Sequence, residues 1–253
     1  MILIKTPKEI DFIRESCKIV AKTLELVKKH AEIGVTTKEL DIIAEDFILS
    51  QNCKAAFKGY RQQGTSPFPS ALCISLNEEV VHGIPSSRKL KDGDIVSIDV
   101  GVLKNGYYGD AATSFIVGTK NSDQIKLLEV TEKSLYLGIA QARKENRVED
   151  ISFAVQSCVE ANGFSVVREL TGHGVGRHLH EDPSIPNFGR QGHGPKLKNG
   201  MTLAIEPMVN YGNKSVFVKE DGWTIAASDG FPSAHFEHSI LVTNEAAEIL
   251  TIT

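Results

Sequence analysis

The sequence is poor in cysteine, and its four cysteines lie far apart, at Cys17, Cys53, Cys73 and Cys158. None of them forms a CxxC pair, which argues against a thiol-rich zinc site or a redox motif. The small number and wide spacing of the cysteines also exclude the disulfide framework of small secreted proteins. We therefore expect free thiols and a cytoplasmic protein.

Long apolar runs and an excess of basic residues are also missing. No stretch approaches the roughly 20 apolar residues of a membrane helix, and the N-terminal MILIKTPKEIDF becomes charged too early for a signal peptide. The 28 basic residues are outnumbered by 32 acidic ones, for a net charge of -4. A weakly acidic chain has no overall field that attracts nucleic acid, so we expect neither membrane nor nucleic acid as a main ligand.

The sequence does contain enough apolar residues for a large core, at 41% of 253. Their helical spacing predicts four helices, over residues 7–30, 36–50, 122–145 and 148–162. Thr6 and Glu9 form a capping-box pattern around Pro7 at the start of the first helix. We expect Ser122 to cap the third helix and Ile125 to lie on its apolar stripe.

Two similar stretches indicate an internal repeat. KDGDIVSID at 91–99 and KNGMTLAIE at 198–206 share a turn, an alternating strand and a final carboxylate. The order of two helices followed by strands also occurs twice. We therefore predict two related halves, about 1–120 and 121–253, which pack face to face in one α+β domain.

The stretch DIVSIDVGVLKNGYYGDAATSF predicts a β-hairpin that carries two aspartates. Asn105-Gly106 is typical of a type I′ turn, which would pair Asp99 with Ala112. Asp110 would then lie on the same face as Asp99, as a diagonal neighbour about 7–8 Å away. Both could be solvent-facing, but aspartate is depleted in strand interiors. The hairpin therefore favours a shared cation.

The second half supplies two glutamates. Glu206 ends TLAIE at the position equivalent to Asp99, and Pro207 should break the strand there. Glu237 precedes another apolar strand, and either glutamate alone could be an ordinary surface acid. Four carboxylates with one histidine match a two-metal site, and this ligand set suits Mn, Fe, Co or Zn.

The stretch TGHGVGRHLHEDP holds three candidate histidines, His173, His178 and His180. Its GHGVG lacks the last glycine of a dinucleotide-binding loop, and no βαβ unit surrounds it. A metal or substrate role is therefore favoured over nucleotide binding, but spacing alone does not say which histidine is a ligand.

Six segments together resemble the type I methionine aminopeptidases: VHGIP, SIDVG, YGDAATSF, GHGVGRHLHE, LAIEPM and HFEHSI. The resemblance runs from about residue 5 to the end. The long insertion that type II enzymes carry between the positions of His180 and Glu206 is absent. The resemblance implies a single catalytic domain over 1–253, with the pita-bread fold and without the N-terminal extension of some type I members.

The resemblance also implies the activity and the residues that perform it. The reaction would remove the N-terminal methionine of peptides and nascent chains, preferring a small second residue, with two divalent metal ions and a bridging water or hydroxide. A monomer is expected, and contact with the ribosome stays open. The implied metal ligands are Asp99, Asp110, His173, Glu206 and Glu237. The implied catalytic residues are His82 and His180, which contact substrate, and Glu206, which takes a proton from the water. His178 has no role in this family.

The methionine pocket is likewise inferred from the resemblance. Its expected walls are Tyr60, Phe68, Cys73, His82, Leu179 and Trp223. Cys73 could instead be a plain core thiol, and Trp223 a packed hairpin aromatic. The sequence departs from the family at Phe57, where a cysteine is frequent, at Leu179, where an aromatic is frequent, and in a longer segment 61–67.

Three other functions remain to be weighed. An enzyme of the same fold that cleaves X-Pro bonds usually has a large N-terminal domain. A binding module that kept the fold would have lost metal ligands, whereas all five are present here. A metal-free structural protein would have no need of them.

Overall fold

The structure is a computed structural model that describes residues 1–61 and 64–252. Its helices are α1 (Pro7–His30), α2 (Thr37–Ser50), α3 (Ser122–Gln141) and α4 (Val148–Ala161). Its strands are β1 (Lys54–Ala55), β2 (Leu72–Leu76), β3 (Glu79–Val81), β4 (Ile95–Lys104), β5 (Tyr107–Ile116), β6 (Ser165–Val166), β7 (Thr171–Gly174), β8 (Glu181–Pro186), β9 (Thr202–Ile205), β10 (Met208–Asn210), β11 (Val216–Val218), β12 (Ile225–Ala227), β13 (Ser233–His235), β14 (His238–Leu241) and β15 (Glu248–Ile249).

Local sequence determines where the first two helices begin. Glu9 N–H donates to the Thr6 hydroxyl at 3.4 Å, and the Glu9 carboxylate accepts from Thr6 N–H at 2.9 Å. This capping box satisfies amides that have no partner inside α1. Thr36 caps α2 in the same way.

The third helix differs from the prediction. Asn121, not Ser122, is its N-cap, because the Asn121 side chain accepts from Gln124 N–H at 2.9 Å. The helix ends at Gln141 rather than near 145. Ile125 is exposed, and Leu127 is buried near that end of the helix. The rest of the predicted apolar stripe is confirmed, because Leu135 and Ile139 are buried and Leu128 packs against the core.

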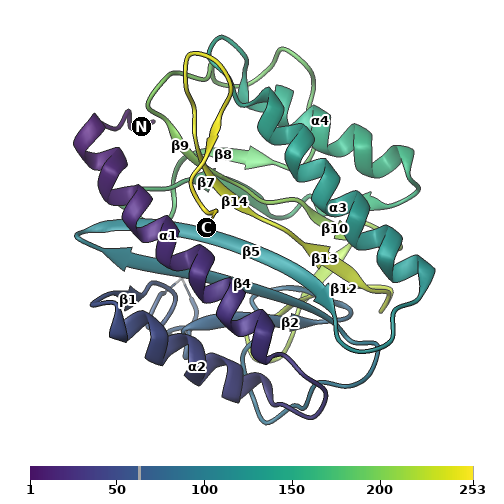
Figure 1. The fold of residues 1–253 in the computed structure, drawn as a ribbon. Coiled ribbons are helices and arrows are strands. Elements are labelled where there is room, and N and C mark those ends of the chain that lie inside the picture. Colours follow the sequence, from purple (N-terminus) through teal and green to yellow (C-terminus); the bar gives the residue numbers. More distant parts are fainter. Residues whose placement is uncertain (62–63, 253) are drawn as a thin grey trace.

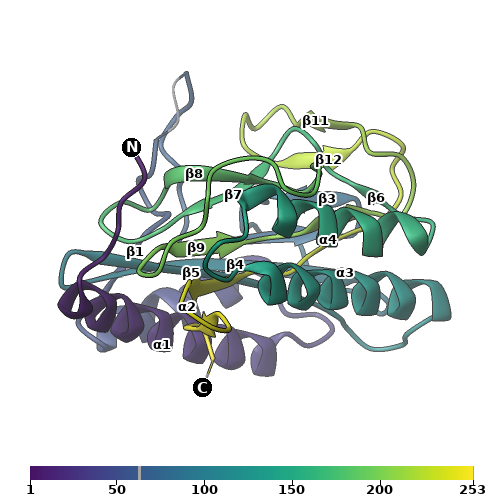
Figure 2. The same ribbon diagram turned by 90° about the horizontal axis from the view of Figure 1, so that it is seen from above.

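Within residues 1–61 and 64–252 the strands form four sheets, and each strand pairing is antiparallel. The first half contributes β1, β4 and β2, with β5 on β4. The second half contributes a sheet of order β15-β14-β9-β7-β8, and two three-stranded sheets complete the fold. Figure 2 shows α1, α2 and α3 along one face of the sheets, with β11 and β12 on the opposite side.

Each half buries its core between two helices and its strands. In the first half, apolar residues of α1 and α2 pack against β2, β4 and β5. In the second half, residues of α3 and α4 pack against β9, β10 and β14. In Figure 1 the two helix pairs are separate, with α1 and α2 toward the lower left and α3 and α4 toward the upper right. This is the two-half arrangement predicted from the repeat.

The predicted hairpin is confirmed in turn and register. Asp99 lies opposite Ala112 and Gly101 opposite Asp110, so the two aspartates are diagonal neighbours on one face. Asn105 and Gly106 both have positive φ, 52° and 82°, as a type I′ turn requires. The strand pairing therefore follows from the type I′ turn and from the alternation of side chains between the two faces of each strand.

The two halves meet where β5 lies beside the segment that leads into β14. Glu237 N–H donates to Ala112 O at 2.9 Å. The Ser239 hydroxyl donates to Asp110 O at 2.7 Å and accepts from Asp110 N–H at 3.2 Å. These bonds bring Glu237 of the second half next to Asp110 of the first.

The strand break expected at Pro207 is also confirmed. β9 ends at Ile205, and β10 begins at Met208 in a different sheet. Glu206 lies between them, at the junction. None of the helices in the described ranges has the length and apolar character needed to span a membrane.

Candidate metal centre and substrate pocket

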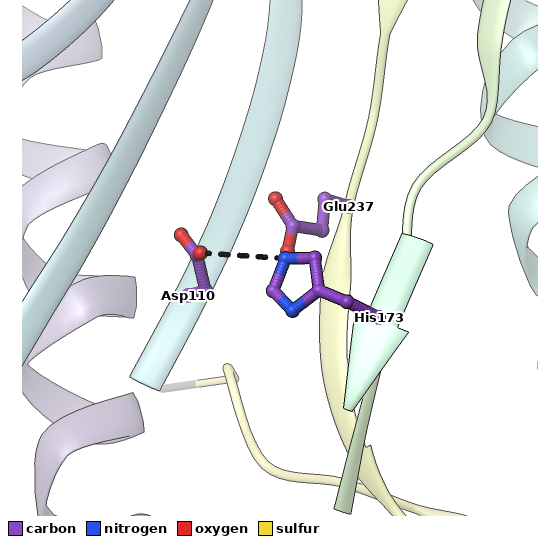
Figure 3. A group of neighbouring side chains, drawn as sticks. All are labelled: Asp110, His173 and Glu237. Carbon is purple, nitrogen blue, oxygen red and sulfur yellow. Dashed lines mark ion pairs between the residues drawn. The ribbon is translucent and has the colours of Figure 1, made fainter. Parts of the chain in front are cut away.

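Three predicted ligands lie together in the centre of the molecule. Asp110 comes from β5, His173 from β7, and Glu237 from the link between β13 and β14 (Figure 3). One potential ligand atom of each lies within 4.8 Å of the others. All three residues are buried, so a cation held here would be largely removed from water.

Asp99 and Glu206 complete the group of five. Glu206 Oε1 lies 3.5 Å from His173 Nε2, and the charges of Asp99 and Glu206 act on the Asp110 carboxyl. All five side chains line one pocket. Two come from the first half and three from the second, so the group exists only when both halves pack together.

The ring of His173 is oriented for metal binding. Its Nδ1 lies 2.9 Å from Gly174 O, and a carbonyl can only accept, so the proton is on Nδ1. The Nε2 lone pair then faces the carboxylates, 3.9 Å from Asp110 Oδ2 and 3.5 Å from Glu206 Oε1. A backbone acceptor that fixes the tautomer in this way is common for histidine ligands of metals.

Unpartnered polar atoms are concentrated at this site. Among the residues that the structure describes, the buried side-chain atoms without a hydrogen-bond partner are Asp99 Oδ1, Asp110 Oδ1, Glu237 Oε1 and His235 Nε2. Buried polar atoms are ordinarily paired. Three of the four are carboxylate oxygens of predicted ligands, and a bound cation would satisfy them. The donor set therefore fits a divalent metal.

Burial raises the pKa of the carboxyl groups at this site, and for Asp99, Asp110 and Glu237 the neighbouring carboxylates add to the effect. Burial raises the pKa of Asp99 to about 7 and that of Glu206 to about 8. Burial and the neighbouring Asp99 and Glu206 charges raise the pKa of Asp110 well above its usual value. Burial and Asp110 do the same to the pKa of Glu237. So much negative charge in one buried space is stable only with compensating cations or protons.

The histidines at the site are held neutral. Burial lowers the pKa of His173 to about 3 and that of His82 to about 4. The neutral form is the one that can bind a metal or offer one donor and one acceptor.

His235 is a member of the site that the sequence analysis missed. It is buried, and its Nε2 lies 3.5 Å from Glu206 Oε2. Burial lowers its pKa. It precedes Glu237 by two residues, and residues two apart in an extended segment share a face. That alternation was the signal that could have revealed it.

The expected substrate residues line the same pocket as the candidate ligands. They are Tyr60, Phe68, Cys73, His82, Leu179, His180 and Trp223, with Phe57 as an addition. The Phe68 and Trp223 rings meet edge to face at 5.3 Å. The pocket therefore has an acidic end and an aromatic, apolar end.

Trp223 lies in the turn between β11 and β12, so it is both a hairpin aromatic and a pocket wall. Its indole N–H donates to Ser66 O at 3.0 Å. That bond ties it to the longer segment 61–67, of which residues 62 and 63 lie outside the described residues.

His82 owes its position to an unusual backbone. Its φ is 59°, in the left-handed region, which few residues other than glycine adopt. The next residue must be small, because a Cβ on Gly83 would lie 2.2 Å from Ile74 O. His178, by contrast, is exposed in a bend at 176–180 and does not line this pocket.

Comparison with known proteins assigns the class. Residues 11–244 match the metallopeptidase family M24, and the chain belongs to that family. The chain is thus a metallopeptidase, a class of hydrolase that uses divalent metal. It is 53% identical over 251 residues to methionine aminopeptidase 1 of Bacillus subtilis, covering 99% of both chains. It is 51% identical over 252 residues to the methionine aminopeptidase of Clostridium perfringens, covering 100% of this chain and 99% of that one.

Solved structures confirm the fold. A crystal structure of methionine aminopeptidase from Thermotoga maritima superposes with a TM-score of 0.96 at 47% identity, over 100% of both chains. A prolidase from Pyrococcus furiosus superposes with a TM-score of 0.79 at 23% identity, and the match covers 65% of that longer chain. The prediction of an α+β pita-bread fold with two pseudo-symmetric halves is therefore confirmed.

Proposed function

We propose that this chain is a methionine aminopeptidase, which removes the N-terminal methionine from peptides and nascent proteins and prefers a small second residue. The observation that carries the proposal is the single pocket with five candidate ligands at one end and an apolar wall at the other. Relatives with that name, 53% and 51% identical over nearly the whole chain, support it.

We further propose that Asp99, Asp110, His173, Glu206 and Glu237 hold two divalent ions, of Co, Mn, Fe or Zn. Two such ions bring four positive charges, which match the four carboxylates. When bound, they would polarise the scissile carbonyl and lower the pKa of a water molecule. The unpartnered oxygens of Asp99, Asp110 and Glu237 favour a ligand role for these residues.

The remaining residues bind and orient the substrate. The apolar walls, among them Phe68, Leu179 and Trp223, would bury the methionine side chain, which is worth about 1.5–3 kcal/mol. His82 and His180 would donate hydrogen bonds to the scissile carbonyl as negative charge develops on its oxygen. Glu206 would accept the proton of the attacking water.

A covalent mechanism through the pocket cysteine is disfavoured. Cys73 lies opposite Asp99 in the sheet. Burial and the Asp99 charge raise the pKa of its thiol well above the usual value. A protonated thiol is a poor nucleophile, so Cys73 acts as a wall.

We propose that the whole chain works as one catalytic domain, as a monomer and in the cytoplasm.

The test is a metal-resolved peptidase assay. Protein stripped with a chelator is reconstituted with one ion at a time and given Met-Ala-Ser, Met-Leu-Ser and Ala-Pro peptides. We expect metal-dependent release of methionine, faster from Met-Ala-Ser than from Met-Leu-Ser, with two ions bound per chain at full activity. Preferential cleavage of Ala-Pro, or no metal-dependent hydrolysis, would overturn the proposal.

A further inference from the structure

The loop between β7 and β8 carries two pocket residues, Leu179 and His180. Its residues 176–180 are bends, without the ladder bonds of a strand. One backbone bond, from Gly176 N–H to His178 O at 3.1 Å, lies within the loop. Residues from the start of the chain make further contacts with it.

Lys5 makes the first contact. Its ammonium pairs with Glu181 Oε2, and the two side chains are only 2% and 3% exposed. Lys5 N–H also donates to Gly200 O at 2.9 Å, which fixes its backbone. The loop approaches Lys5 closely, because a Cβ on Gly176 would lie 2.5 Å from Lys5 Cε and would displace that side chain.

Glu181 connects Lys5 to the backbone of the loop. Its second oxygen, Oε1, accepts from His178 N–H at 3.0 Å. Its two carboxylate oxygens thus hold Lys5 on one side and the loop backbone on the other. Leu179 and His180 are the two residues between these attachment points.

A second ion pair anchors the beginning of the same loop. Arg177 Nε donates to Glu9 Oε1 at 2.6 Å. Glu9 is itself held by the Thr6 cap and by the Tyr107 hydroxyl at 3.1 Å. Two ion pairs, Lys5 with Glu181 and Glu9 with Arg177, thus join the N-terminal segment to the loop.

We propose that Lys5 and Glu181 are positioning residues for the peptidase reaction: their buried ion pair holds Leu179 against the methionine side chain and His180 against the scissile carbonyl. A buried ion pair is a weak source of stability, so its benefit here lies in the geometry of the loop. Neither residue lines the pocket. The inference rests on the proposed function, because it assigns these two residues to that same site.

The test compares Lys5→Met, Glu181→Gln and the double variant with wild type on Met-Ala-Ser. We expect KM to rise and kcat to fall so that kcat/KM drops about tenfold or more, with metal content unchanged. Discrimination between methionine and leucine as first residue should also weaken. The double variant should lose little more than either single variant, since residues that act as a unit are not additive.

Two controls separate positioning from simple loss of stability. Val159→Ala removes buried volume from the core under α4, so it should lower Tm without changing kcat, KM or the methionine preference. Lys5→Arg keeps the charge and should restore part of the activity.

The possible results distinguish a failure of the proposed peptidase function from a failure of the positioning role of Lys5 and Glu181. If wild type does not release methionine, the proposed function fails. If wild type is active and the Lys5 and Glu181 variants change only Tm, or lose metal, the positioning role fails and the proposed function stands.

Discussion

The Tyr60 hydroxyl lies 2.7 Å from Nδ1 of His180, and it links the loop after β1 to the loop before β8. The two rings are tilted by 56° with their centroids 5.2 Å apart. Burial lowers the pKa of His180, so its ring is neutral and offers one donor and one acceptor. If the hydroxyl donates to Nδ1, then Nε2 carries the proton that the proposed bond to the substrate carbonyl requires.

Tyr60→Phe tests that arrangement. The ring that forms the pocket wall remains, but the bond that fixes the tautomer of His180 is lost. We expect kcat to fall about fivefold to tenfold, the effect of one hydrogen bond of about 1 kcal/mol, with KM nearly unchanged. Steady-state kinetics on Met-Ala-Ser measures both. Tyr211→Phe, remote from the pocket, is the control, and an equal loss in both variants would argue against the assignment.

Asp99→Asn tests the metal centre. The substitution keeps the size of the side chain but removes the charge that faces Asp110 and Glu206. We expect kcat/KM to fall by at least about 100-fold, because metal chemistry supplies several kcal/mol of transition-state stabilisation. Bound metal, measured by elemental analysis after dialysis, should fall as well. A variant with two bound ions and the wild-type rate would contradict the ligand assignment.

His82→Ala tests the division between ligands and substrate contacts. His82 lies in the pocket, near Trp223 at a ring-centroid distance of 6.3 Å. We expect a fall in kcat of about 100-fold or more, typical of a lost oxyanion donor, with metal content near that of wild type. Loss of metal would instead make His82 a ligand.

Glu9→Gln tests the electrostatics of the N-terminal segment. The Arg177 hydrogen bond and the Thr6 amide lower the pKa of Glu9 from 4.5 to about 2. A carboxyl with a lowered pKa stabilises the fold above its unfolded-state pKa, and this stabilisation is lost as the pH falls from about 4.5 to about 2. At pH 7 we expect a cost of about 1 kcal/mol, kept small because the Arg177 side chain is 54% exposed.

The measurement is the urea midpoint of metal-free wild type and Glu9→Gln at pH 7, 5 and 4. The difference between them should be constant from pH 7 to about 5 and then shrink. Glu129→Gln, at an exposed position of α3, gives the baseline. A difference that grows as the pH falls has the opposite sign and would rule out this linkage.

Sequence reasoning succeeded where one short stretch carries the information. The Asn105-Gly106 turn fixes the register of β4 and β5 and hence the shared face of Asp99 and Asp110. Thr6 and Glu9 fix the start of α1. These features depend on dihedral preferences and on bonds between residues a few positions apart, which the order of the residues specifies directly.

It failed where neighbouring residues compete or distant ones meet. Asn121 and Ser122 are both good caps, and Asn121 is the one used. Leu127 packs in the core with Ile95 and Val155, whereas Ile125 is exposed. His235 was missed because its partner, Glu206, lies far away in the sequence, at the junction between β9 and β10. The Lys5–Glu181 contact joins residues 176 positions apart, and no local pattern indicates such a pair.

The sequence by itself determined the starts of α1 and α2, the hairpin and, through its resemblance to a known family, the set of residues to look for. Only the tertiary structure decided that β5 lies beside β14, with Asp110 bonded to Ser239 across 129 residues, and that carboxylates of both halves share one buried pocket. The reason is physical: hydrogen bonding within a turn is local, whereas the meeting of two halves depends on how much apolar surface they bury together.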